Sequence, residues 1–310
     1  DAKFGSRMHL SAGGRVDNYS TIGSSFNPRV GFVAQPYERG NTKLTVGRAF
    51  RAPSAYELYY NDEGRTQLPA RPLRPETIWS AEIEHSHRFT STVVGSAAVY
   101  GSAIRDLIDA VPAQTRQANL SPQAQGGEAV DAAPQNREAF QFGNTPLPIV
   151  AVGTEIGLRR EWRSGWMASL YYGYTRTRFV SDGRMRSLLM FDQAKTVRHV
   201  ANSPVHSATF KGVAPFLIRG LSMATRVTLE DARWDRNESL TDEPQQRTSA
   251  AVFWDLVLTA EDPKHHLNFA VGIYNLFDWR YAYPLGRESS FQRTIASNGR
   301  TLLASVETHF

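Results

Sequence analysis

The chain has 310 residues, of which 41% are hydrophobic and 21% charged, and its mean hydropathy is −0.40. No apolar run approaches the roughly 20 residues that a transmembrane helix needs, which excludes a helical membrane protein but not a β-barrel, because only alternate residues of a barrel strand face lipid. The net charge of +5 is spread without a basic run, so nucleic-acid binding is not indicated, and the absence of cysteine excludes disulfides and cysteine metal sites.

Apolar and polar residues alternate in segment after segment, as in β-strands that have two different faces. Many of these segments reach about 10 residues, which a tilted strand needs to cross a bilayer, whereas strands of soluble proteins usually have about 5–6. The alternation predicts an all-β chain of about twelve long antiparallel strands. In chain order these are residues 6–19, 25–36, 42–51, 74–89, 92–110, 137–161, 165–178, 197–213, 219–234, 247–260, 265–279 and 292–310.

The predicted connections differ in length on the two sides of the sheet. Short connections are expected at 35–41, 89–92, 161–165, 215–220 and 261–265. Long connections are expected at 51–73, 111–136, 179–196, 234–246 and 280–291. Apart from the short first connection at 20–24, this is the asymmetry of bacterial outer-membrane barrels, and it places the short turns in the periplasm and the long loops outside the cell.

The alternation also predicts which side chains face lipid and which face the concave side. We expect these apolar side chains to point outward: Leu267, Phe269, Val271, Ile273, Leu302, Ala304 and Val306. We expect these charged side chains to point to the concave side: Arg15, Glu82, Glu155 and Arg159. Aromatic residues near strand ends, such as Trp79, Tyr172 and Tyr281, fit an interfacial girdle.

Several motifs follow one another in a recognisable order. They are G-x-R-x-D at 13–17, P-R-x-G at 28–31, T-K-L at 42–44, A-F-R-A-P-S-x-x-E-L at 49–58, L-x-P-E-T at 73–77, N-x-P-x-H at 202–206, N-L-F-D at 275–278, Gly299-Arg300 and a terminal Phe310. Each motif alone is weak, and each has a structural interpretation as a strand start, exit or turn. Together they resemble the β-barrel of TonB-dependent outer-membrane receptors.

The resemblance implies a barrel of about 22 strands around a plugged lumen, of which residues 1–310 would be roughly the second half, as one domain. The plug and the segment that binds the TonB energy-coupling complex would have no counterpart in this sequence. We expect an open, curved half-barrel in preference to a smaller closed barrel. The expected surroundings are outer-membrane lipid and lipopolysaccharide, and Phe310 would be read by the barrel assembly machinery.

We expect a receptor component and not an enzyme, because no G-x-S-x-G, H-E-x-x-H or Walker-type loop is present. No cofactor or metal site is predicted: His85 and His87 share a face of one strand, but the sequence shows no third ligand. The expected ligand is a ferric siderophore or a cobalamin-like molecule, and the alternative is a passive porin-like channel. Haem is disfavoured by the resemblance, because no histidine lies between Arg51 and Glu84.

A surplus of arginine in the predicted loop 179–200 favours an anionic ligand or lipopolysaccharide phosphates. With the tyrosines that follow the A-F-R-A-P-S motif, these loop residues form the candidate ligand-binding set. The set is Arg51, Tyr56, Tyr59, Tyr60, Arg184, Arg186, Arg198 and Arg287.

Overall fold

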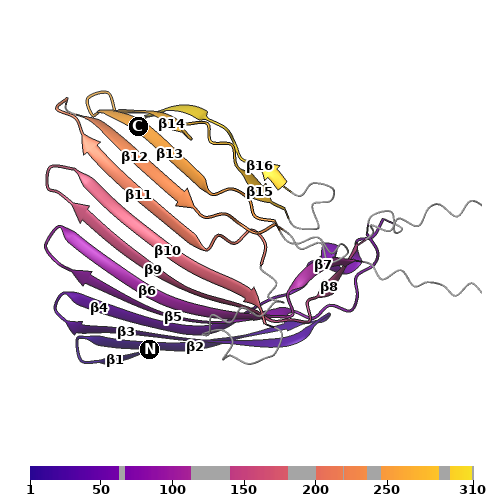
Figure 1. Cartoon of the computed structure of the whole chain (residues 1–310). Helices are drawn as coiled ribbons and strands as arrows, with labels where there is room; N and C mark the ends of the chain where they lie inside the picture. Colours follow the sequence, from indigo (N-terminus) through magenta and orange to yellow (C-terminus); the bar gives the residue numbers. More distant parts are fainter. Residues whose placement is uncertain are drawn as a thin grey trace, which may run out of the picture.

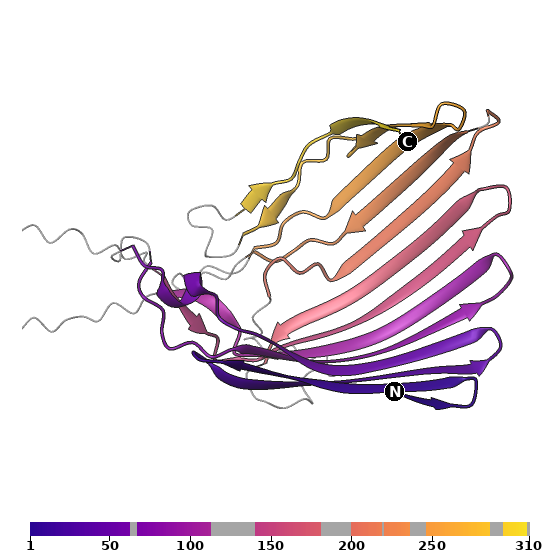
Figure 2. The same ribbon diagram turned by 180° about the vertical axis from the view of Figure 1, so that it is seen from behind.

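The computed structural model describes residues 1–62, 67–112, 140–180, 200–218, 220–235, 246–285 and 294–308. Its main element is a 13-stranded antiparallel sheet whose strands lie side by side in chain order (Figures 1 and 2). The strands are β1 (Ala2–Phe4), β2 (Met8–Tyr19), β3 (Gly23–Tyr37), β4 (Gly40–Arg51), β5 (Glu76–Arg88), β6 (Val93–Arg105), β9 (Ile149–Glu161), β10 (Met167–Phe179), β11 (His206–Pro215), β12 (Leu221–Glu230), β13 (Ala251–Asp262), β14 (Leu267–Tyr274) and β17 (Thr301–Thr308). Among the described residues, no helix is long and apolar enough to cross a membrane.

The sheet is open, as predicted. Its order runs from β1 to β17 and does not join these two edge strands within the described residues. Figures 1 and 2 show a wall that curves like half of a barrel. The last described strand ends at Thr308, so the predicted end at Phe310 lies outside the described residues.

The register divides the strand residues into an apolar face and a polar face. Directly paired residues of neighbouring strands share a face, and Ile273 pairs with both Leu256 and Leu302. The same apolar face continues at Val99, which pairs with Ile83 and with Thr154. The predicted outward set, from Leu267 to Val306, lies on this face, and Arg15, Glu82, Glu155 and Arg159 lie on the other.

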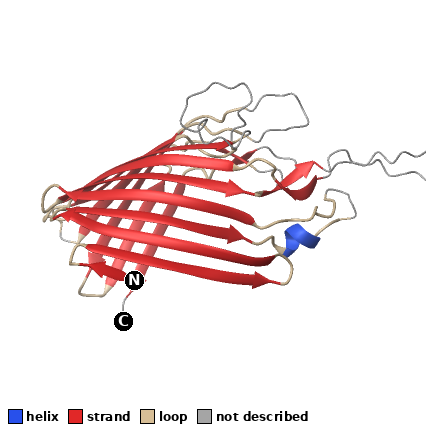
Figure 3. Cartoon of the chain, turned by 90° about the horizontal axis from the view of Figure 1, so that it is seen from below, coloured by secondary structure: helices blue, strands red, loops and turns tan. Residues whose placement is uncertain are grey.

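Burial identifies the apolar face as the convex one. Side chains crowd together on the inside of a curved sheet and separate on its outside. On the polar face, Ser169 is 5% exposed and Asp255 is 7% exposed, whereas Val99 and Leu170 on the apolar face are 58% and 55% exposed. The curvature is visible in Figure 3. The sheet therefore has an apolar convex face and a polar concave face.

The two ends of the sheet differ, as the connection lengths predict. At one end, called the turn end, short turns join β1 to β2, β3 to β4, β5 to β6, β9 to β10, β11 to β12 and β13 to β14. At the other end, called the loop end, long connections follow β4, β6, β10, β12 and β14. Two small hairpins lie on the loop-end connections: β7 (Ile108–Pro112) pairs with β8 (Phe140–Asn144), and β15 (Ala282–Pro284) pairs with β16 (Thr294–Ala296).

Some predicted strands were too long. Residues 92–110 form two strands, because Asp106 adopts a positive φ of 57° between β6 and β7. Residues 137–161 and 292–310 are likewise interrupted, between β8 and β9 and between β16 and β17. The strand predicted at 197–213 begins only at His206, after Asn202 with a φ of 58°. A left-handed residue turns the chain out of the sheet.

A short helix, α1 (Ala55–Tyr59), was not predicted. Ser54 is its N-cap, since its hydroxyl accepts from the Glu57 backbone N–H, and the Glu57 carboxylate accepts from the Ser54 backbone N–H. This reciprocal pair is a capping box. The letters S-x-x-E after Pro53 are the sequence signal for this capping box, although the motif that contains them was interpreted as a strand exit.

Candidate ligand-binding site at the loop end

A buried hydrophobic cluster of the described residues lies beyond the sheet, at the loop end. Here α1, residues 67–73 and the β7–β8 hairpin pack together, and we call them the loop-end platform (Figures 1 and 3). Ile108, Ala110 and Phe142 form its buried core, with Leu73 and Phe140 packed against it. Strand β7 follows β6 in the chain and β8 precedes β9, and β6 and β9 are neighbours in the sheet. The platform is therefore a continuation of the wall.

Gln67 joins the helix to the hairpin. It is 1% exposed, and its amide nitrogen donates to the Tyr60 carbonyl at 3.1 Å while its amide oxygen accepts from the Tyr56 hydroxyl at 3.2 Å. On the hairpin side, Gln67 bridges to Phe140, and the neighbouring Leu68 N–H donates to the Phe140 carbonyl. A buried amide must satisfy its hydrogen bonds, so Gln67 fixes the position of the tyrosines relative to β8.

Arg51, a candidate ligand residue, lies between two carboxylates. Its guanidinium donates to both oxygens of Glu76 at 2.7 Å and to both oxygens of Glu57 at 2.9 and 3.0 Å. Glu76 also accepts from the Ile108 backbone N–H at 2.8 Å. Arg51 thus ties the ends of β4 and β5 to α1 and β7. Its charge is compensated within the chain, so the structure gives it a positioning role, and direct ligand contact stays a prediction.

The pKa of Glu57 reflects this contact. Burial raises it, but the hydrogen bonds from Arg51 and Ser54 lower it by more, so the pKa lies below the usual 4.5. A carboxylate with a lowered pKa stabilises the fold above its unfolded pKa and loses that contribution as the pH falls.

We therefore expect the loop-end platform to loosen when the pH falls below about 4.5. Amide hydrogen exchange in α1, compared at about pH 6 and pH 3.5 after correction for intrinsic rates, measures this. In Glu57→Gln the protection should be lower at the higher pH and should depend less on pH, since Glu76 remains as the second carboxylate of the clamp. Equal pH dependence in both proteins would contradict the assignment to Glu57.

The three candidate tyrosines are displayed by the platform. Tyr56, Tyr59 and Tyr60 are 54%, 67% and 44% exposed. The rings of Tyr56 and Tyr60 are stacked with centroids 4.6 Å apart, and Tyr56 packs edge-on against Phe142. Their hydroxyls and ring faces can accept a planar or polar ligand at low entropic cost, because the platform already holds the backbone.

A second group at the loop end was missed by sequence reasoning. Arg233 donates to Glu230 at 2.6 Å and to the Asn202 side chain at 2.8 Å, and it lies 5.3 Å from the centre of the Tyr283 ring. The N-x-P-x-H motif at 202–206 thus holds the start of β11 against the end of β12. Tyr281, predicted as a girdle residue, is instead 2% exposed and bonds to Thr248 at 2.9 Å, which corrects that assignment.

The N-L-F-D motif forms the turn that leaves β14, as its structural interpretation predicts. Asn275 has a φ of 53°, and its side chain accepts from the Trp279 N–H at 2.8 Å and donates to the Trp279 carbonyl. Asp278 accepts from the Arg300 N–H at 2.8 Å, which lowers the pKa of its carboxyl. The other candidate ligand residues, Arg184, Arg186, Arg198 and Arg287, lie outside the described residues.

A curved antiparallel sheet with a convex apolar face, a concave polar face, short turns at one end and long loops at the other is the wall of an outer-membrane-type β-barrel. A family model described as "TonB dependent receptor-like, beta-barrel" matches residues 1–276. The chain therefore belongs to the TonB-dependent receptor-like β-barrel family. Receptors of this family are barrels of the Gram-negative outer membrane.

Solved structures show the same fold at low sequence identity. The FrpB iron transporter from Neisseria meningitidis (F3-3 variant) is 17% identical with a TM-score of 0.68, and covers 98% of this chain and 43% of its own. A mutant (G324V) of the ferric enterobactin receptor PfeA from Pseudomonas aeruginosa is 18% identical with a TM-score of 0.68, and the match covers 98% of this chain and 43% of PfeA. The copper transporter OprC is 14% identical with a TM-score of 0.66, and the match covers 99% of this chain and 46% of OprC. This chain thus spans less than half the length of each. No curated protein sequence matches it.

Proposed function

We propose that this chain forms part of the wall of an outer-membrane receptor that takes up a scarce ligand by TonB-dependent transport. The observation that carries the proposal is the family match over residues 1–276, together with the two-faced sheet that it covers. In this arrangement the convex face contacts outer-membrane lipid and the concave face lines the lumen. The turn end lies in the periplasm and the loop end outside the cell.

The proposed ligand is an iron chelate of the catecholate type. FrpB is an iron transporter and PfeA a ferric enterobactin receptor, which supports this class of ligand. In this chain the exposed Tyr56, Tyr59 and Tyr60 offer ring faces and hydroxyls suited to aromatic catechol rings. The loop arginines Arg184, Arg186, Arg198 and Arg287 would supply positive charge for an anionic chelate, as the sequence predicts.

Further partners belong to the same proposal. Lipopolysaccharide would surround the loop end of the convex face, and the last strand would contact the barrel assembly machinery. Interaction with the TonB energy-coupling complex, which the family implies, is part of the same proposal. The TonB-coupled receptor is favoured over a porin by the family match, and an enzymatic role has no support in the family.

Growth under iron limitation tests the proposal. Cells that produce the receptor should grow on a ferric tris-catecholate as sole iron source, and growth should stop when the TonB protein is removed. A passive porin would allow small solutes to enter without TonB, so TonB-independent growth would support the porin alternative. Cyanocobalamin uptake, measured in parallel, separates the two ligand classes.

A pair of variants tests the platform as the binding site. Tyr59→Ala removes the most exposed of the three tyrosines and should weaken chelate binding by about three- to tenfold, the value of one aromatic contact. The control is Trp166→Ala, which removes a half-exposed aromatic ring at the turn end and should leave binding unchanged. Equal losses in both variants would assign binding elsewhere.

A further inference from the structure

Three side chains converge at the turn end of the convex face, far from the loop-end platform. Tyr37 comes from the end of β3, and His85 and His87 come from β5. The Tyr37 hydroxyl lies 2.8 Å from His85 Nε2 and 3.1 Å from His87 Nδ1. Two imidazole nitrogens from one strand therefore point at the same phenol oxygen, which the sequence alone did not show.

The backbone places the Tyr37 ring where it meets the histidines. The β3–β4 register shifts between Ala34 and Tyr37, which turns the tyrosine toward β5. The ring then lies against Gly40 on β4, because a Cβ on Gly40 would be 2.3 Å from the Tyr37 Cζ atom. Gly40 pairs with His87. The Tyr37 ring therefore passes over β4 at a glycine, and any larger residue at this position would clash with the ring.

The histidines are also held in position. His85 and His87 are two residues apart on one strand, so their rings project from the same face. The Thr42 hydroxyl lies 2.8 Å from His85 Nδ1 and can accept its proton, which leaves the Nε2 lone pair directed at Tyr37. A ring whose second nitrogen is fixed by a hydrogen bond is the arrangement found for metal-binding histidines.

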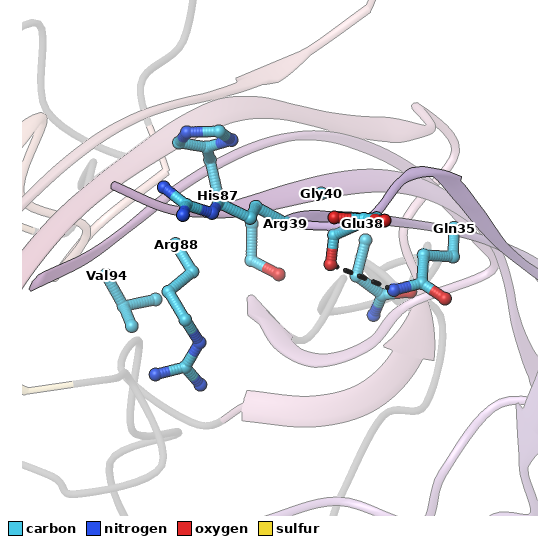
Figure 4. A pocket seen from close by; sticks show the side chains of 9 residues that line it. Gln35, Glu38, Arg39, Gly40, His87, Arg88 and Val94 are labelled. Carbon is cyan, nitrogen blue, oxygen red and sulfur yellow. Dashed lines mark hydrogen bonds between the residues drawn. The ribbon is translucent and has the colours of Figure 1, made fainter. Parts of the chain in front are cut away.

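The cluster lies at the protein surface, at the turn end, where the strands leave the lipid in the proposed arrangement. Tyr37 is 43% exposed and both histidines are partly exposed. Figure 4 shows a pocket at this turn, with the His87 ring on the opposite side of the strand from Arg88 and Val94. The Arg88 charge thus lies across the sheet from the imidazole rings, and a small cation can approach the rings from the periplasmic side of the turn.

We propose that His85, His87 and Tyr37 form a binding site for a divalent transition-metal cation, a function that goes beyond the transport of a ligand through the barrel. Within the described ranges no three His, Cys, Asp or Glu side chains group into a metal site. The proposed site has the Tyr37 phenol oxygen as its third donor, because both imidazole nitrogens lie within 3.1 Å of it. Imidazole nitrogens bind such cations at about 2.0–2.1 Å. Two donors that each lie about 2.0–2.1 Å from one cation are themselves roughly 3 Å apart, close to the 2.8 and 3.1 Å that separate the Tyr37 oxygen from the two imidazole nitrogens. The cation would take the place of the phenol proton, which is released to solvent on binding.

The donor set determines which cation is preferred. Imidazole suits both copper and zinc, and the general affinity order places Cu²⁺ above Zn²⁺. Arg39 lies at the same turn and donates to the Phe89 carbonyl, and its positive charge lowers the affinity for any cation bound nearby. We therefore expect one Cu²⁺ to bind at this site, and Zn²⁺ to bind more weakly.

Copper titration of the detergent-solubilised full chain tests the site. Calorimetry should show one saturable Cu²⁺, and electron paramagnetic resonance should show coupling to two nitrogens. His87→Gln should weaken binding by more than about tenfold and leave one coupled nitrogen. Thr42→Val should weaken it by about tenfold while keeping both nitrogens, because Thr42 positions a ligand without touching the metal.

The matched control is His206→Gln. His206 Nδ1 lies 2.7 Å from the Tyr172 hydroxyl, so it forms a histidine–tyrosine pair on the same convex face but without a second imidazole. This variant should bind Cu²⁺ as the unaltered chain does. Absence of saturable binding by the unaltered chain, or an equal loss in His206→Gln and His87→Gln, would overturn the proposal. Neither result bears on chelate uptake at the loop end.

Discussion

Replacing Val99 by arginine is expected to prevent assembly of the receptor in the membrane. Val99 lies in the middle of β6, on the convex face, 58% exposed and between Ile83 and Thr154. An arginine on the lipid face at the bilayer midplane costs about 2–4 kcal/mol. That corresponds to a roughly 30- to 1,000-fold lower equilibrium constant for folding into the membrane. Heat-modifiable migration of the receptor from outer membranes on denaturing gels measures the assembled amount.

The adjacent residue provides the control. Ala98 lies on the concave face, directly between Glu84 and Glu155 of the two neighbouring strands. An arginine there meets two carboxylates in an aqueous lumen, so Ala98→Arg should assemble at least as well as the unaltered protein. If Ala98→Arg fails and Val99→Arg assembles, the faces are assigned in reverse, since a shift by one residue exchanges them.

Replacing Arg51 by methionine is expected to disorder the loop-end platform while the sheet stays folded. Glu57 and Glu76 are only 13% and 14% exposed, and both accept from the Arg51 guanidinium. Without it, two mostly buried carboxylates lie close together with no cation, which costs about 2–3 kcal/mol. Limited proteolysis should cut within residues 52–75 much faster, and chelate binding should fall in parallel.

Two comparisons make the Arg51 result specific. Arg74→Met removes an ion pair with Asp106 at the same end, but Arg74 is 71% exposed, and exposed pairs contribute about 0–1 kcal/mol. Arg51→Lys keeps the charge and loses the two-sided fork, so it should give an intermediate rate of cleavage. Equal cleavage in the Arg51→Met and Arg74→Met variants would show that the platform does not depend on the clamp.

The sheet could be predicted from the sequence because its strands and turns are determined by residues that are close together in the chain. A period of two fixes which side chains share a face, and connection lengths fix the two ends. Val271 and Glu155 were thus placed on their faces without any knowledge of their partners. The errors occurred where single residues depart from the strand conformation, as at Asp106 and Asn202, whose positive φ is not encoded by a glycine.

The loop-end platform could be predicted only in part. The capping box of α1 was readable in Ser54 and Glu57, because its two hydrogen bonds are local. The burial of Gln67 was not, because it depends on Phe140, and the two are distant along the chain. Arg51 was predicted as a ligand residue from its charge and its motif. Its ion pairs with Glu57 and Glu76 were not predicted, because the sequence does not show which side chains lie next to it. Tyr37 was missed because its partners lie on a non-adjacent strand.

The chain-order arrangement of the strands has a consequence for how the wall is built. Each strand of the main sheet pairs only with its nearest predecessor and successor in that sheet, from β1 to β17. The wall can therefore grow one hairpin at a time, closing mostly short loops and exposing a single new edge at each step. The step from β6 to β9 spans the longest insertion, since the next partner follows only at Ile149. We infer that this step is the slowest in growth of the sheet, and that shortening the 113–139 segment would accelerate it.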